Sequence, residues 1–205
     1  FSPGYPLVFS WHGFGGNAPD FLSGELQAAA IASDPSIILI VPQALNKGGK
    51  TSFDPFSNSR RNYDLAFFDD LLTCAKERLA VDNERIYTTG MSNGGLMSGM
   101  LLATRSSTLA AAAPLSGGMS VAFAGDHKTI PALVVWGGTQ DFAYEQNFDL
   151  LATTMIDDLV AKGHFVIGCN HNSGHIIPSQ AWVWTLEFLL AHHKGMTQSP
   201  FETDL

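Results

Sequence analysis

"TTGMSNGGLMSGM", residues 88–100, sets a serine among small residues where a short apolar run gives way to a helical pattern. The run over residues 85–89 predicts a strand, and the pattern over residues 96–102 predicts a helix. Between them, residues 90–94 form a G-x-S-x-G sequence. In this context the serine lies on a tight strand-to-helix turn, with its hydroxyl above the sheet. The stretch therefore favours a nucleophile at Ser92 over a turn that merely contains a serine.

The rest of the chain alternates short apolar runs with helical periodicity, which favours one fold class. Further strands are predicted over residues 6–11, 37–42, 110–116, 131–137 and 164–169, and helices over residues 65–79, 151–159 and 179–193. Several runs are apolar at nearly every position, as in parallel strands that are covered on both faces. The order predicts an α/β protein with a mainly parallel, doubly wound sheet of about six strands or more and helices on both faces.

Composition limits what the chain can bind. Its 205 residues suffice for a single domain over residues 1–205, and a formal net charge of −8 argues against nucleic acid and anionic membranes as partners. No apolar run reaches the roughly 18 residues that span a bilayer. Cys74 and Cys169 fit neither a zinc-site spacing nor a disulfide scaffold, so we expect free thiols. No group of residues in the sequence predicts a metal site.

The stretch "WHGFGGN", residues 11–17, follows the first predicted strand and predicts a second part of the same site. An acyl-transfer enzyme aims two N–H groups at the oxyanion of the tetrahedral intermediate. We expect one from Asn93, directly after the nucleophile, and one from Phe14, because the glycines around it let the backbone approach a substrate. His12 is expected to fix this loop rather than to act as a base. A glycine-rich turn that opens a helix is the alternative interpretation.

Polar residues after the last two predicted strands complete a catalytic arrangement. Asp141 and His175 each lie just beyond such a strand. The carboxyl ends of parallel strands meet at one edge of a sheet. Where a serine on a G-x-S-x-G turn belongs to a Ser–His–Asp triad in an α/β sheet, the chain order is serine, acid, histidine, and Ser92, Asp141 and His175 follow that order. We expect His175 to exchange the Ser92 proton and Asp141 to orient the imidazole. The turn residues around His175 favour it over His171, the rival base.

Two connections bear on the substrate. Segment 43–63 is long for a connection and carries Phe53, Phe56 and Tyr63, which we expect to border the site and shape the acyl or alcohol pocket. A solvated loop anchored by these aromatic residues is an equally good interpretation. Residues 117–131 are too few to form a helical lid. An open site without a separate lid domain follows, and it favours short-chain or polymer-linked esters.

The blocks "HGFGGN", "DNERIYTTGMSNGGLMS", "LSGG", "GGTQD" and "CNHNSGHIIP" occur in this order over nearly the whole chain. In these blocks the chain resembles the α/β-hydrolase superfamily and, more narrowly, its polyhydroxybutyrate depolymerase and feruloyl or acetyl-xylan esterase group. The resemblance implies ester hydrolysis by a secreted type of enzyme, extracellular or periplasmic, without a cofactor. Members usually have one or two further strands before the "HG" loop, so the resemblance leaves two expectations open: a sheet that lacks N-terminal strands in this sequence, or an unusually small one.

The leading hypothesis is a serine carboxylesterase that forms an acyl-enzyme on Ser92 and acts on small-molecule or polymeric esters. A serine peptidase on the same fold is the second hypothesis, and a feature that grips a peptide terminus would distinguish it. A non-catalytic binding module is the third. Such modules typically lose a triad residue, whereas this chain keeps a candidate for every position.

Overall fold

A parallel sheet forms the centre of the computed structural model, which describes residues 4–57, 62–196 and 198–202. Six strands pair in the order β10-β7-β6-β5-β1-β2, and every pairing between them is parallel. The strands are β1 (Tyr5–Trp11), β2 (Ile38–Ile40), β5 (Val81–Met91), β6 (Ala111–Leu115), β7 (Ala132–Trp136) and β10 (Val166–Asn170). The predicted doubly wound α/β sheet is confirmed.

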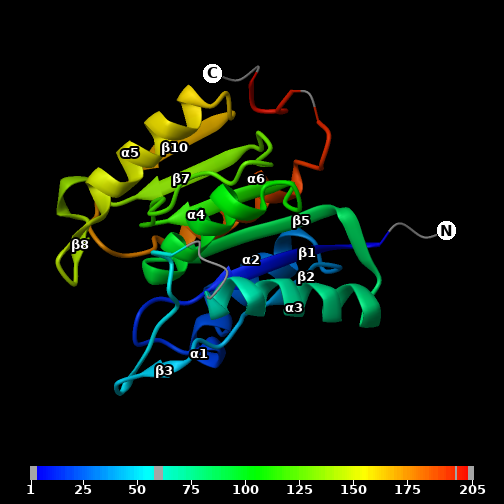
Figure 1. Cartoon of the computed structure of the whole chain (residues 1–205), viewed down its shortest axis with the longest axis horizontal. Helices are drawn as coiled ribbons and strands as arrows, with labels where there is room; N and C mark the ends of the chain where they lie inside the picture. The colour runs from blue at the N-terminus through cyan, green and yellow to red at the C-terminus, as the bar shows by residue number, and fades with distance from the viewer. Residues whose placement is uncertain (1–3, 58–61, 197, 203–205) are drawn as a thin grey trace.

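Helices cover both faces of this sheet (Figure 1). One face carries α3 (Tyr63–Arg78), α4 (Asn93–Arg105) and α5 (Phe148–Ala161), and the other carries α2 (Glu25–Ser33) and α6 (Ser179–Leu190), with the short α1 (Ala18–Leu22) beside α2. Each face has its own buried apolar cluster. The central strands β6 and β7 are apolar and buried at every position, because both of their faces lose contact with water.

Local sequence explains where α3 begins and which way it faces. The Asn62 side chain accepts hydrogen bonds from the backbone N–H groups of Asp64 and Leu65, which satisfies donors that have no partner within the helix. The apolar stripe from Leu65 through Phe68 and Leu72 then packs against the sheet. In this packing the Phe68 ring meets the Phe9 ring of β1 edge to face, with 4.9 Å between the ring centres.

Two small hairpins stand at the carboxyl edge of the sheet. One pairs β3 (Asn46–Lys47) with β4 (Lys50–Thr51), and the other pairs β8 (Phe142–Ala143) with β9 (Gln146–Asn147). The first lies in the long segment 43–63, of which residues 58–61 fall outside the described ranges. It is fixed to the glycine-rich loop by a 2.8 Å hydrogen bond from the Gly15 N–H to the Thr51 carbonyl.

The connection between β6 and β7 contains no helix, since residues 116–131 are all described and form only turns and extended chain. The prediction that no separate lid domain is present is therefore confirmed for this connection. Of the helices in the described ranges, none combines the length and hydropathy needed to cross a bilayer. Cys74 and Cys169 are free thiols, as predicted.

Candidate active site

The turn from β5 to α4 holds Ser92 in an unusual backbone conformation, with φ 60° and ψ −119°. Two close backbone approaches force this turn to use glycine. A Cβ at Gly90 would lie 2.6 Å from the Trp11 carbonyl oxygen, and a Cβ at Gly94 would overlap the same carbonyl group. Strain of this kind in a non-glycine residue persists only where the surrounding structure holds it. The side chain of Ser92 thereby stands at the N-terminus of α4, where the helix dipole favours negative charge.

Glycines also bring the loop after β7 against the loop after β10. A Cβ at Gly137 would overlap the Gly174 carbonyl group, and the Gly174 N–H donates a 3.0 Å hydrogen bond to the Gly137 carbonyl. Asp141 lies four residues beyond Gly137, and His175 directly follows Gly174. Backbone contact between the two loops therefore sets the distance between the carboxylate and the imidazole.

A continuous chain of hydrogen bonds joins the predicted residues Ser92, His175 and Asp141. His175 Nδ1 lies 2.6 Å from Asp141 Oδ1, and His175 Nε2 lies 2.9 Å from Ser92 Oγ. With its proton on Nδ1, the neutral imidazole donates to the carboxylate and accepts the serine hydroxyl proton. The structure thus brings together three side chains that lie far apart in the sequence, in the arrangement that a serine nucleophile needs.

The carboxylate of Asp141 is fully buried and surrounded by donors. Burial alone would raise the pKa of Asp141, but its hydrogen bonds from His175, from the Gly137 N–H and from the Ser116 hydroxyl outweigh burial and lower that pKa. The latter two donors both lie 2.7 Å from Asp141 Oδ2. Asp141 is therefore held as a carboxylate, which is the form that stabilises an imidazolium.

Phe14 and Asn93, the residues expected to donate their backbone N–H groups, line the same cavity as Ser92. Within the described ranges, neither N–H has a hydrogen-bond partner. Asn93 uses its side chain elsewhere: Oδ1 accepts the Phe53 N–H at 2.8 Å, and Nδ2 donates to the Phe53 carbonyl at 3.2 Å. The prediction that these two N–H groups bind an oxyanion requires them to be unpaired in this way.

His12 is a structural residue of the glycine-rich loop, as expected. It is fully buried, its Nδ1 lies 2.8 Å from the Gly13 carbonyl, and its Nε2 accepts the Ala44 N–H at 3.1 Å. Burial lowers the pKa of His12 more than the bond to Gly13 raises it, so the imidazole stays neutral. His171, the rival base, accepts the Ser173 N–H and does not join the chain that links Ser92 to Asp141.

A cavity of about 240 Å³ opens beside the serine. Its described lining is apolar and aromatic apart from four uncharged polar residues, and it consists of Phe14, Ser52, Phe56, Ser92, Asn93, Leu96, Ala143, Tyr144, Gln146 and Phe148. Small-molecule sites typically combine such an apolar lining with a few placed polar groups. The cavity is large enough for a compact acyl group.

Only one of the three aromatic residues expected to border the site does so. Phe56 lines the cavity, with its side chain 56% exposed. Phe53 is 2% exposed and packs edge-on against Trp11 in the core, because its backbone is tied to Asn93. Tyr63 is 81% exposed at the first residue of α3 and does not line the cavity. The expectations for Phe53 and Tyr63 as pocket walls were therefore wrong.

Two residues that the sequence did not single out contact the candidate triad. Ser116, with φ 39°, donates to Asp141, and the Phe148 ring stacks on the His175 ring at 4.4 Å. Ser116 stands directly after β6, at the same sheet edge as the other functional residues. That position in the "LSGG" block was the available signal. Phe148 carries no comparable signal, since it opens an ordinary amphipathic helix.

Comparison with known proteins identifies relatives of this chain. Residues 40–181, which include Ser92, Asp141 and His175, match the model of the prolyl oligopeptidase family. Feruloyl esterase D of Neurospora crassa is 28% identical over 147 residues, which cover 67% of this chain and 48% of that protein. Probable feruloyl esterase C of Aspergillus niger is 31% identical over 140 residues, or 65% of this chain and 48% of that protein. The chain spans about half the length of these relatives.

Solved structures share the fold. A carboxylesterase from Bacillus cereus superposes with a TM-score of 0.68 at 20% identity, over 92% of this chain and 91% of that chain. A carboxylesterase from Mesorhizobium loti gives 0.69 at 18% identity, over 90% and 88% of the two chains. The predicted α/β-hydrolase fold and the resemblance to an esterase group of that superfamily are confirmed. Since the family model matches more than half of its residues, this chain belongs to the prolyl oligopeptidase family.

Proposed function

We propose that this chain is a serine carboxylesterase. The observation that carries the proposal is the unbroken hydrogen-bond chain from Ser92 Oγ through His175 to the buried Asp141. It ends at a strained turn beside a cavity with two free N–H groups. Donors of that kind can stabilise a tetrahedral oxyanion by several kcal/mol, about 2.7–4 for one donor. The feruloyl esterase relatives support an ester as the substrate.

The proposed reaction has two halves. Ser92 Oγ attacks the ester carbonyl while His175 Nε2 takes its proton, and the oxyanion is bound by the N–H groups of Phe14 and Asn93. Collapse of this intermediate breaks the bond to the alcohol, which leaves with the proton from His175. Water then attacks the acyl-enzyme, with His175 as base, and releases the acid. Asp141 remains ionised throughout and orients the imidazole.

The substrate proposed is an ester with a compact acyl group, either small or attached to a polymer. The cavity of about 240 Å³ is walled by aromatic side chains, and the connection after β6 lays no helix over it. An aromatic acyl group, such as the feruloyl group in the names of the relatives, suits these walls, because offset and edge-to-face ring contacts are favourable. Long acyl chains would extend beyond the cavity into water.

A serine peptidase is the second candidate, because the matching family model is that of the prolyl oligopeptidases. The same triad could attack an amide. A peptidase would also need groups that grip a peptide on both sides of the scissile bond. None of the described residues that line the cavity carries a charge, so the cavity itself offers no group that would hold a peptide terminus.

Hydrolysis of p-nitrophenyl esters from acetate to palmitate, and of ethyl ferulate, tests the proposal directly. Rates should be highest with short or aromatic acyl groups and should vanish in Ser92→Ala. Ser98→Ala is the matched control, since Ser98 is buried in α4, the helix directly after Ser92, and its hydroxyl bonds Thr88 Oγ1 rather than His175. A peptide p-nitroanilide cleaved faster than any ester would establish the peptidase instead. A folded protein that cleaves neither would be a binding module.

An extracellular or periplasmic location belongs to the same proposal, and it rests on the resemblance to secreted esterases. No cofactor enters the proposed chemistry, because the nucleophile, the base and the oxyanion donors are all protein groups. Cell fractionation with an antibody against the natural protein checks the location. Recovery with cytoplasmic markers would contradict it.

A further inference from the structure

A lysine stands over two aromatic rings at the mouth of the candidate site. The Lys50 Nζ lies 5.3 Å from the centre of the Phe14 ring and 5.6 Å from that of the Tyr144 ring. The two rings themselves meet edge to face, 4.9 Å apart. An ammonium within about 6 Å of a ring centre is attracted by the ring's negative face. Phe14 and Tyr144 both line the cavity that contains Ser92, so the charge is held at its rim.

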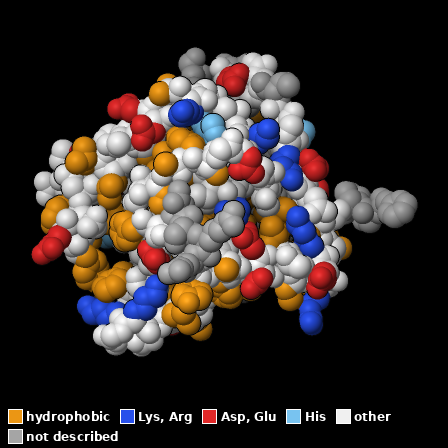
Figure 2. All heavy atoms as spheres, viewed as in Figure 1, with side chains coloured by type: hydrophobic (Ala, Val, Ile, Leu, Met, Phe, Trp, Pro, Cys, Tyr) orange, Lys and Arg blue, Asp and Glu red, His pale blue; other side chains and the backbone are white. Residues whose placement is uncertain are grey.

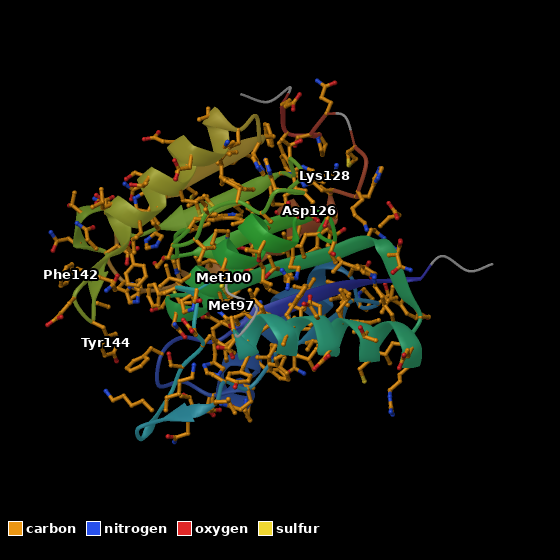
Figure 3. The ribbon with its side chains drawn as sticks, in the orientation of Figure 1. Met97, Met100, Asp126, Lys128, Phe142 and Tyr144 are labelled. Atoms are coloured by element: carbon orange, nitrogen blue, oxygen red, sulfur yellow. The ribbon has the colours of Figure 1, made fainter. Side chains whose placement is uncertain are left out.

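Three loops meet in this cluster, and hydrogen bonds fix each of them. Lys50 lies on β4, where the neighbouring Thr51 bonds the glycine-rich loop through its carbonyl and its hydroxyl. Tyr144 lies on the β8–β9 hairpin and reaches toward the β3–β4 hairpin (Figure 3). In Figure 2, blue basic side chains lie beside orange hydrophobic ones over the β3–β4 hairpin. The backbone segments that carry Lys50 and Tyr144 are therefore held by hairpin pairing rather than lying on free loops.

The turn that presents Tyr144 is strained. Tyr144 and Glu145 have φ 47° and 63°, the left-handed values that a two-residue hairpin turn requires at its centre. Asparagine and glycine adopt these values most readily, whereas this chain has a tyrosine and a glutamate. Strain retained at a ligand site is an indication of use. Here it sets the Tyr144 ring between the cavity and the lysine.

Lys50 differs from its neighbour in the same hairpin. Lys47 lies opposite Lys50 in the ladder, and its Nζ is 3.6 Å from Asp64 Oδ2. Lys50 forms no ion pair with any carboxylate in the described ranges. None of the described residues that line the cavity carries a charge either. An uncompensated cation thus stands at the rim of an uncharged pocket.

We infer that Lys50 selects esters whose acyl group carries a carboxylate at its far end. The inference rests on the proposed function, and it names the substrate class more narrowly. The apolar part of such an acyl group would occupy the cavity between Phe14 and Phe148, and its carboxylate would meet the ammonium at the rim. Two opposite charges at about 4 Å in water attract by about 1 kcal/mol, which corresponds to about a fivefold preference. The net charge of −8 repels anions elsewhere, so the preference requires this local cation.

Monoethyl esters of succinic, adipic and suberic acid test the inference, each against its neutral primary amide of the same shape. At the best chain length we expect kcat/KM for the acid to exceed that for the amide about fivefold. Lys50→Met keeps the aliphatic stem and should bring the ratio to about one or below. Lys50→Arg should keep the preference. Lys47→Met is the matched control, since it changes the net charge equally and should leave the ratio unchanged. Salt at about 1 M, where the Debye length is about 3 Å, should abolish the preference in the natural chain.

Three results would overturn the inference. One is a ratio near one at every chain length in the natural protein. The second is an equal loss of rate on acids and amides in Lys50→Met, since Lys50 would then only support the aromatic rings. The third is an equal effect of Lys47→Met, which would attribute the preference to net charge. If neither the acids nor the amides nor p-nitrophenyl acetate are hydrolysed by the natural protein, the esterase itself is refuted, and the inference falls with it.

Discussion

The inner part of the candidate site and its rim are held in place by different contacts. Ser92, Asp141 and His175 stand on turns that touch backbone to backbone, where glycines leave no room for a Cβ. Phe56 and Tyr144 at the rim are more than half exposed. Tyr144 is held by the β8–β9 hairpin and by its ring contact with Phe14, and Phe56 by the hydrogen bond from its N–H to Asp54 Oδ1. A displacement of the inner groups moves reacting atoms, whereas a change at the rim alters only what the pocket accepts. Reaction chemistry and substrate choice can therefore vary separately in this molecule.

Loss of the Asp141 charge should have the largest effect on the inner part. Asp141→Asn keeps the shape of the side chain but cannot hold the imidazole tautomer that accepts the Ser92 proton. We expect kcat on a short-chain ester to fall about 10⁴-fold, with the fold retained in circular dichroism. Asp149→Asn is the matched control, because its oxygen can still accept the Trp136 indole N–H. A fall below about tenfold in Asp141→Asn would show that this carboxylate does not orient the base.

A methyl group between the two loops of the triad should have the next largest effect. Gly137→Ala would force the loop after β7 away from the Gly174 carbonyl and move Asp141 relative to His175. Misplacement of a reacting group by about 1 Å costs about 100-fold in rate. The control is Gly125→Ala, where a Cβ meets nothing within 4 Å and φ is not positive. Steady-state kinetics and thermal unfolding of both variants check this. Equal activity in the two variants would show that the backbone contact between the loops does not set the position of Asp141.

Substitutions at the rim should alter preference rather than reaction chemistry. Phe56→Ala enlarges the cavity mouth, so we expect a severalfold shift of kcat/KM toward longer acyl chains, with the rate on acetate nearly unchanged. One methylene in an apolar pocket changes binding by about 1–3 kcal/mol at most. Tyr63→Ala, which removes an exposed ring from the same segment, should change neither. The chain-length profile of p-nitrophenyl esters distinguishes them, and a loss of acetate hydrolysis in Phe56→Ala would place Phe56 in the inner part.

The smallest effect concerns stability at low pH. Because the pKa of Asp141 is lowered in the folded protein, its stabilising contribution is complete above the unfolded value of about 3.9 and is lost as pH falls through the lower, folded value. Urea unfolding between about pH 6 and pH 3 should therefore show a steeper acid loss in the natural chain than in Asp141→Asn. Between about pH 6 and pH 3 the unfolded state binds at most one more proton than the folded state at Asp141. The free energy of unfolding therefore falls by at most about 1.4 kcal/mol per pH unit from this residue. Parallel curves would contradict it.

The residues of the inner part could be chosen from the sequence alone, because the patterns that mark them are local and occur in a fixed order along the chain. Each functional residue follows a strand that is recognisable from its apolar run, and parallel strands bring these ends together. The glycines at positions 90 and 94 signal the turn at Ser92 directly. This is why the positions of Ser92, Asp141 and His175 could be predicted without a structure.

The rim could not be predicted, because its contacts join loops of irregular conformation. Phe53 and Phe56 lie three residues apart, yet a hydrogen bond to Asn93 draws one backbone into the core and leaves the other at the cavity. No local pattern distinguishes them. The contact between Lys50 and Tyr144 joins two hairpins that lie far apart in the sequence, at residues 46–51 and 142–147. The turn at Tyr144 also lacks the asparagine or glycine that usually marks such a hairpin.

The most direct test of the account is to trap the acyl-enzyme. The protein is mixed with excess p-nitrophenyl acetate, quenched in acid within the first turnover, digested and analysed by mass spectrometry. We predict a single acetyl group on the peptide that contains Ser92, accompanied by a burst of p-nitrophenolate equal to the protein concentration, and neither in Ser92→Ala. Acetylation of another residue with hydrolysis retained in Ser92→Ala would contradict the central claim that Ser92 is the nucleophile of an esterase.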